Sequence, residues 1–100
     1  MVQASGEALD KAFQAAQTFI STSDSKTGPK LSNSDKLEFY SLFKQASVGP
    51  CTGKQPSRLN IVARAKYDAW KALGKLSKDD AKRRFIQLLQ KKVPSYNAKL

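Results

Sequence analysis

The central segment of the chain reads Tyr40-Ser41-Leu42-Phe43-Lys44-Gln45-Ala46. On an α-helix, with about 100° between successive residues, Phe39 and Leu42 fall on one narrow stripe of the kind that faces a core. Side chains three and four positions apart are neighbours on a helix surface, so Tyr40, Phe43 and Lys44 form a patch beside that stripe. This patch suits an aromatic group attached to a phosphate. It fits equally well an aromatic pair at the edge of a core with a solvated lysine.

The composition describes one globular domain with a strong positive charge. The chain has 100 residues, of which 40% are hydrophobic and 26% are charged, a balance typical of a folded domain with a single modest core. Eighteen Lys and Arg stand against eight Asp and Glu, which gives a formal net charge of +10. The excess favours anionic partners, namely nucleic acid, an acidic membrane surface or a phosphorylated small ligand. Charge alone does not choose among them.

Residues that the sequence lacks exclude several chemistries. There is no histidine, which removes the most common general base and the most common metal ligand. The single cysteine, Cys51, leaves no internal disulfide and no thiolate cluster, and it indicates a reducing compartment. Neither a secretory leader nor an apolar stretch of roughly eighteen residues is visible. We therefore expect a soluble cytoplasmic binding protein that is not an enzyme, with no catalytic residues and no metal site.

Apolar periodicity predicts four helices and no strand. The helices are expected at about residues 6–20, 34–47, 60–73 and 77–93. Ser5, Ser34 or Asn33, Asn60 and Ser77 are suitable N-caps for them. A connector rich in Ser, Thr, Gly and Pro covers residues 21–34. The predicted architecture is all-α, with four helices around one core.

Two of these helices place a lysine among aromatic side chains. Lys44 lies beside Phe43, and Lys66 projects from the apolar span of the third helix, between Trp70 and Leu73. An ammonium group in such a position must extend to water along its stem or meet an anion. If the second and third helices face each other, both ammonium groups could converge on one phosphate. Each charge-assisted hydrogen bond would contribute roughly 1.5–3 kcal/mol.

The segments that carry these features are similar to a known family. They are Tyr40 to Gly49, Ala65-Lys66-Tyr67-Asp68-Ala69-Trp70, Ser77-Lys78-Asp79-Asp80-Ala81 and, in the first helix, Leu9-Asp10-Lys11-Ala12. Together they resemble the acyl-CoA-binding protein family. The resemblance implies an up-down-down-up four-helix bundle, with one acyl-CoA-binding domain over residues 1–100 and a core at about 6–94. It implies no cofactor, and a long-chain acyl-CoA as the ligand.

The resemblance also implies roles for individual residues. The positions of Tyr40, Lys44 and Lys66 would hold the ribose 3′-phosphate, Phe43 would stack on the adenine, and Phe85 would contact the coenzyme. The acyl chain would lie in an apolar groove beneath the head group. With the neighbouring positions, the ligand-binding set implied is Tyr40, Ser41, Leu42, Phe43, Lys44, Lys66 and Phe85.

Several positions depart from the family pattern. Phe43 and Phe85 stand where the family usually has tyrosine, so stacking is retained and the phenolic hydrogen bonds are lost. Gln17 and Val62 match positions where a lysine often contacts the ligand, and Arg64 is a nearby cation that could compensate. We include these last three residues in the candidate site.

The function implied is that of a non-enzymatic intracellular carrier of medium- and long-chain acyl-CoA esters. Such a monomeric protein would buffer and transport the acyl-CoA pool, with transient contacts to membranes or to enzymes that use acyl-CoA. A small basic nucleic-acid binder is an alternative, because a Gly-containing turn joins the last two helices as in a helix-turn-helix. A thioesterase or transferase is a remote alternative, since no histidine base is present.

Overall fold

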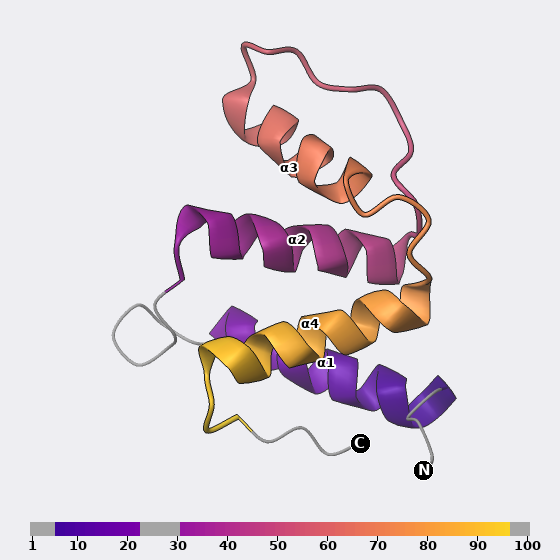
Figure 1. Cartoon of the computed structure of the whole chain (residues 1–100), viewed down its shortest axis with the longest axis vertical. Coiled ribbons are helices and arrows are strands. Elements are labelled where there is room, and N and C mark those ends of the chain that lie inside the picture. The colour runs from indigo at the N-terminus through magenta and orange to yellow at the C-terminus, as the bar shows by residue number, and fades with distance from the viewer. Residues whose placement is uncertain (1–5, 23–30, 97–100) are drawn as a thin grey trace.

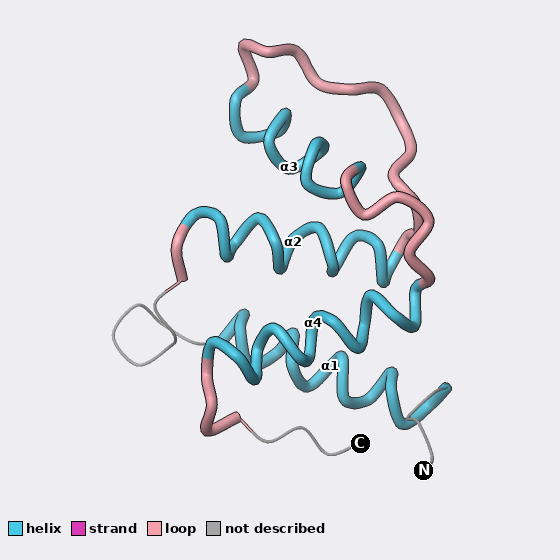
Figure 2. The backbone as a smooth tube through the Cα atoms, in the orientation of Figure 1, coloured by secondary structure: helices cyan, strands magenta, loops and turns pink. Residues whose placement is uncertain are grey.

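Four helices make up the regular structure of the described chain. The computed structural model describes residues 6–22 and 31–96, and within these ranges it contains helices and loops but no strand (Figure 2). The helices are α1 (Gly6–Thr22), α2 (Asn33–Ser47), α3 (Ile61–Lys71) and α4 (Lys78–Lys92). The all-α prediction is confirmed. No helix among the described residues is long and apolar enough to cross a lipid bilayer.

The chain follows an up-down-down-up course (Figure 1). α1 and α2 run in opposite directions, and the loop of residues 48–60 then carries the chain back along α2. α3 therefore runs in the same direction as α2, and α4 turns back again. This is the topology that the resemblance implied.

The start of α2 differs from the expectation. Its N-cap is Ser32, not Asn33 or Ser34. The Ser32 Oγ accepts a hydrogen bond from the backbone N–H of Asp35 at 3.0 Å, and the Asp35 carboxylate accepts one from the backbone N–H of Ser32 at 3.1 Å. This reciprocal pair is a capping box. The helix begins earlier than predicted because Asp35, three residues after Ser32, completes the box.

The caps of α3 and α4 are those predicted. Asn60 accepts from the backbone N–H of Ala63 at 3.4 Å, and Ser77 accepts from that of Asp80 at 3.1 Å. The Ser5 cap and most of the predicted connector lie outside the described residues.

The hydrophobic core is formed by α1, α2 and α4. Its buried residues are Leu9, Ala12, Phe13, Ala16, Phe39, Leu42, Ala46, Ala81, Phe85, Ile86, Leu88 and Leu89. Within it, Phe85 meets Phe13 and Phe39 edge to ring, each at a centroid separation of 5.1 Å. Such edge-to-face pairs are preferred over face-to-face stacking. The core therefore fixes α2 and α4 relative to α1.

α3 stands apart from this core and packs against α2 alone among the four helices (Figure 1). Trp70 is its one buried residue, and the indole Nε1 donates to the backbone oxygen of Gly49 at 2.8 Å. α3 ends at Lys71, earlier than the predicted Leu73, because a turn follows in which Gly74 has a φ of +61°. Since α3 and α4 do not pack together, the helix pair on which the nucleic-acid alternative depended is not formed.

Candidate functional site

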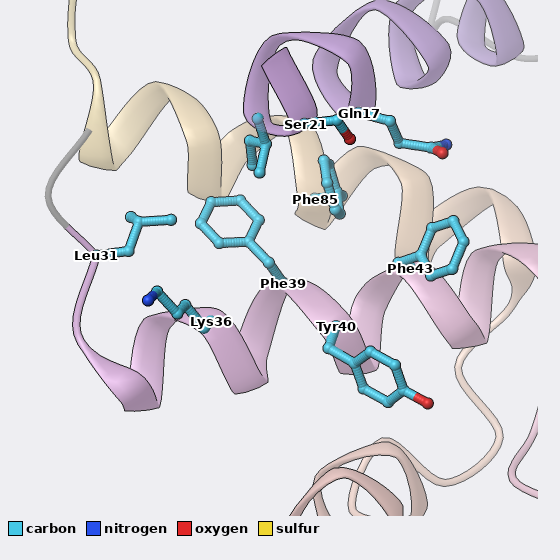
Figure 3. A pocket seen from close by; sticks show the side chains of 9 residues that line it. Gln17, Ser21, Leu31, Lys36, Phe39, Tyr40, Phe43 and Phe85 are labelled. Atoms are coloured by element: carbon cyan, nitrogen blue, oxygen red, sulfur yellow. The ribbon is translucent and has the colours of Figure 1, made fainter. Parts of the chain in front are cut away.

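An apolar groove lies where α1, α2 and α4 meet (Figure 3). Its volume is about 330 Å³, at the lower end of the range for small-molecule sites. The lining residues are Gln17, Ile20, Ser21, Leu31, Lys36, Phe39, Tyr40, Phe43 and Phe85. Four of the nine are aromatic, so the groove can accept a flat ring or an aliphatic chain.

Two reciprocal cation–π contacts join α2 to α3. The Nζ of Lys44 on α2 lies 4.9 Å from a ring centroid of Trp70 on α3, and the Nζ of Lys66 on α3 lies 5.1 Å from the ring centroid of Tyr40 on α2. Residues 40 and 44, like residues 66 and 70, are four apart and share one helix face. We call these four side chains the α2–α3 seam. Both ammonium groups lie in it.

The two seam lysines have no acidic neighbour to neutralise them. Neither forms an ion pair with a carboxylate of the described residues, and the sequence contains no Asp or Glu between Glu38 and Asp68. A cation–π contact at an exposed site contributes about 0.5–1 kcal/mol, less than the roughly 1.5–3 kcal/mol of a charge-assisted hydrogen bond. A phosphate that enters the seam can therefore draw both ammonium groups off the rings.

Tyr40 connects the seam to the groove. It lines the groove, and its side chain is directed toward α3, under the Lys66 ammonium (Figure 3). Phe43, one turn further along α2 on the same face, is 38% exposed and also lines the groove. Phe85 is 3% exposed, so it forms a fixed part of the wall rather than a mobile contact. A ligand with an anionic and a flat part could therefore contact seam and groove together.

Two members of the predicted set point away from this site. Ser41 and Leu42 are each 3% exposed, and neither lines the groove. The Ser41 hydroxyl donates to the backbone oxygen of Glu38 at 2.8 Å, and Leu42 belongs to the core. The reason is helical rotation: positions 41 and 42 lie about 100° and 200° around the helix from position 40.

The last three members of the candidate set, Gln17, Val62 and Arg64, differ in their surroundings. Gln17 lines the groove opposite α2. Val62 is 64% exposed at the start of α3 and does not line it. Arg64 directs its Nε toward the Asp68 carboxylate at 3.2 Å, so this guanidinium is already paired. A hydrogen bond from Gln55 and the charge of Arg64 lower the pKa of Asp68, which keeps this pair ionised.

Some lining residues were not identified from the sequence. Lys36 precedes Tyr40 by four positions, and this spacing places it on the same face of α2 and could have identified it. Leu31 lies in the predicted connector, where no periodicity gives a signal. Phe39 was assigned to the core, which is correct, yet its ring also borders the groove.

Gln45 connects α2 to the turn that follows α3. It is fully buried, and its Nε2 donates to the backbone oxygens of Gly74 at 3.0 Å and Leu76 at 2.7 Å. These bonds attach the turn between α3 and α4 to the end of α2. The Gln45 Oε1 is buried and has no hydrogen-bond partner among the described residues.

The site offers binding groups rather than reactive ones. No cluster of three or more His, Cys, Asp or Glu side chains able to hold a metal ion occurs within residues 6–22 and 31–96. The polar groups present are three ammonium groups, a phenol, a serine hydroxyl and an amide, and they lie among aromatic rings. They can hold a phosphate next to a ring that stacks.

A family profile described as "Acyl CoA binding protein" matches residues 10–89. The chain belongs to the acyl-CoA-binding protein family. The resemblance noted in the sequence is thereby confirmed, and so is the fold that it implied.

Individual relatives support the same family. The chain is 46% identical over 82 residues to acyl-CoA-binding protein homolog 3 of Caenorhabditis elegans, with 81% of this chain and 70% of that protein covered. It is 40% identical over 89 residues to acyl-CoA-binding domain-containing protein 1 of Arabidopsis thaliana, covering 88% of this chain but only 26% of the plant protein. The chain thus spans about a quarter of that longer relative.

The fold also matches a solved member of the acyl-CoA-binding protein family. The crystal structure of Oryza sativa acyl-CoA-binding protein 2 superposes with a TM-score of 0.76 at 33% sequence identity. The match covers 89% of this chain and 99% of the rice chain. The arrangement of four helices is therefore shared over nearly the whole length of that protein.

Proposed function

We propose that this protein binds acyl-CoA esters without catalysing their conversion, with the head group in the α2–α3 seam and the adjoining groove. The observation that carries the proposal is the reciprocal pairing of Lys44 with Trp70 and of Lys66 with Tyr40. It brings two unneutralised ammonium groups from different helices to one seam, beside an aromatic groove. Membership in a family of binding proteins supports the same conclusion.

The first step of binding is capture of the ribose 3′-phosphate. Lys44 and Lys66 would turn from their rings to the phosphate oxygens, and the Tyr40 hydroxyl would donate a hydrogen bond. Two charge-assisted bonds of roughly 1.5–3 kcal/mol each exceed the cation–π contacts that are given up. This head-group term would be the same for every acyl-CoA ester.

The second step places the adenine on Phe43. The ring is 38% exposed, so stacking would remove apolar surface from water, and stacking of a base on an aromatic side chain contributes about 1–3 kcal/mol in single-strand binding proteins. Phe85 would support the coenzyme from the wall of the groove. Both residues lack the hydroxyl of tyrosine, so binding here would rely on stacking and shape.

The acyl chain would supply a large part of the affinity. Burying about fourteen methylenes at roughly 0.8 kcal/mol each gives a gross gain of about 11 kcal/mol before ordering costs. The affinity should therefore increase with chain length until the apolar surface is filled, which favours medium- and long-chain esters. Equal affinity for acetyl-CoA and palmitoyl-CoA would show that burial of the acyl chain does not contribute to binding.

A non-catalytic binder of this kind would buffer and transport the acyl-CoA pool. The single free cysteine, Cys51, fits a reducing compartment such as the cytoplasm. The seam and the groove are formed within one chain, so a monomer suffices. Delivery would bring the carrier into transient contact with membranes and with enzymes that use acyl-CoA.

Titration calorimetry with palmitoyl-CoA and palmitoyl-dephospho-CoA, which lacks the 3′-phosphate, tests the assignment of the seam. Wild-type protein should prefer palmitoyl-CoA by at least about tenfold. Lys44→Ala and Lys66→Ala should each reduce that preference, and the double variant should abolish it. Lys91→Ala, an exposed lysine of α4 outside the seam, is the control with the same change in net charge. Equal loss of affinity for both ligands in the lysine variants would contradict the assignment.

A further inference from the structure

An apolar tip protrudes where the loop of residues 48–60 enters α3. Leu59 is 93% exposed, Ile61 is 76% exposed and Val62 is 64% exposed. We call these three side chains the apolar tip. They are three of the five large hydrophobic residues that are exposed in the described part of the chain, and they lie within four consecutive positions. Exposed apolar groups gathered in this way mark an interaction surface.

The local sequence leaves the tip without a packing partner among residues 6–22 and 31–96. A hydrophobic residue before an N-cap usually packs against the fourth residue of the helix. Here Leu59 precedes the Asn60 cap, and the fourth helical position is Arg64, which is paired with Asp68. Because α3 packs only against α2, no other helix covers the tip, which lies at one end of the molecule (Figure 2).

Basic side chains flank the tip. Lys54 and Arg58 precede it, both exposed and without an ion pair to any carboxylate of the described residues. They belong to the stretch between Glu38 and Asp68 that contains no acidic residue. An apolar tip with adjacent unpaired cations complements a surface that is negative outside and apolar beneath. Anionic lipid bilayers have this arrangement.

We infer that the apolar tip inserts into the surface of an anionic bilayer while Lys54 and Arg58 contact the lipid head groups. A protein partner fits less well, because specific interfaces bury about 800 Å² on each side and three side chains on a protrusion offer far less. A second copy of this chain also fits less well, because two molecules of net charge +10 repel each other. The inference deepens the proposed carrier function, since α3 also holds Lys66 of the seam.

Vesicle binding of the full chain, measured by co-sedimentation without acyl-CoA, tests this inference independently of ligand binding. Vesicles of phosphatidylcholine alone are compared with vesicles that also contain phosphatidylserine. We expect binding to the serine-containing vesicles only. Leu59→Ser combined with Ile61→Ser should weaken it by roughly tenfold. Lys54→Gln and Arg58→Gln should each weaken it by roughly fivefold, with a smaller effect at high salt.

Matched variants and a second readout complete the test. Val48→Ser changes an exposed apolar residue outside the tip, and Lys91→Gln a cation on α4; both should bind vesicles like the wild type. In Leu59→Trp, tryptophan emission should shift to the blue on phosphatidylserine vesicles, against the constant signal of the buried Trp70. Acyl-CoA affinity of the double serine variant should stay within twofold of wild type, so loss of vesicle binding and loss of ligand binding are separable.

Three results would overturn the inference. The first is that the wild type fails to bind the anionic vesicles. The second is that the double serine variant binds them as well as the wild type does. The third is that light scattering shows a dimer that the Leu59→Ser substitution dissociates. The last result would assign the tip to contact between two copies of the chain.

Discussion

The Nζ of Lys66 lies 5.1 Å from the ring centroid of Tyr40, a residue on the neighbouring helix. The ammonium group extends from an otherwise apolar span of α3 and is held by a ring, not by a carboxylate. A ring gives up a cation more easily than a carboxylate does, because the cation–π contact contributes only about 0.5–1 kcal/mol. The contact with Tyr40 therefore keeps the Lys66 ammonium group oriented without pairing it with an opposite charge.

Replacing the seam lysines should weaken the binding of every acyl-CoA ester to the same extent. Lys44→Ala and Lys66→Ala each remove one bond to the phosphate, which corresponds to roughly 1.5–3 kcal/mol or about 10- to 150-fold in Kd. Calorimetric titration with esters of roughly eight to sixteen carbons should give parallel losses. An effect confined to one chain length would place the lysines beside the acyl chain and not the phosphate.

Phe43→Ala should lower the affinity for the nucleotide head group and leave the contribution of the acyl chain unchanged. In competition with adenosine 3′,5′-bisphosphate, loss of the stacked ring should cost about 1–3 kcal/mol, while Phe43→Tyr should retain the binding. Because Phe43 is partly exposed and outside the core, thermal stability should change little. Val48→Ala, another exposed apolar residue of the same region, is the matched control. If the affinity of Phe43→Ala were unchanged, the adenine would not stack on Phe43.

Gln45→Ala should destabilise the fold strongly for a single polar substitution. The change removes the donor to the backbone oxygens of Gly74 and Leu76 and leaves a cavity, so we expect a loss of about 2–4 kcal/mol in the free energy of unfolding. Urea titration measures this loss. Gln87→Ala, at an exposed position of α4, should stay within about 0.5 kcal/mol of wild type. A similar result for Gln45→Ala would show that the turn between α3 and α4 is held by other contacts.

Asp35 should make the protein sensitive to acid. A hydrogen bond from Lys92 at 2.8 Å, followed by bonds from Ser32, lowers the pKa of this carboxyl. A carboxyl whose pKa is lower in the folded state adds stability above its unfolded pKa of about 3.9. That stability is lost as the pH falls through the lower folded value.

The urea midpoint followed from pH 6 down to about pH 2 measures the contribution of Asp35. The part of the acid slope below about pH 4 should be smaller in Asp35→Asn than in wild type. Glu7→Gln, which changes an exposed acid of α1 paired with Lys11 on the same helix, should retain the wild-type slope. A wild-type slope in Asp35→Asn would mean that other carboxyls cause the acid sensitivity.

Local signals in the sequence predicted most of the fold. The caps Asn60 and Ser77 are short-range features, and both were located correctly. The start of α2 was misplaced because three adjacent residues can each act as a cap, and only the partner at position 35 distinguishes them. The placement of Lys66 within an apolar span indicated that its ammonium group must extend to water or meet an anion. In the structure Lys66 is exposed and its ammonium group lies over the ring of Tyr40.

The rest depended on contacts between distant residues. Gln45 bonds to backbone oxygens 29 and 31 positions away, which no local pattern indicates. Leu31 reaches the groove from a segment without periodicity. Ser41 and Leu42 entered the candidate set because the family motif was taken as a continuous run, whereas helical rotation separates them from Tyr40.

Because α3 packs against α2 alone among the four helices, a ligand bound between these two helices would stabilise the position of α3. An acyl-CoA head group held by Lys44 and Lys66 would add a link between α2 and α3 to the cation–π contacts that already join them. Occupancy would then slow amide hydrogen exchange in α3 more than in α1 or α4, since a ligand stabilises the states that bind it. Ligand binding would then be detectable as increased protection of α3, the helix that stands apart from the hydrophobic core.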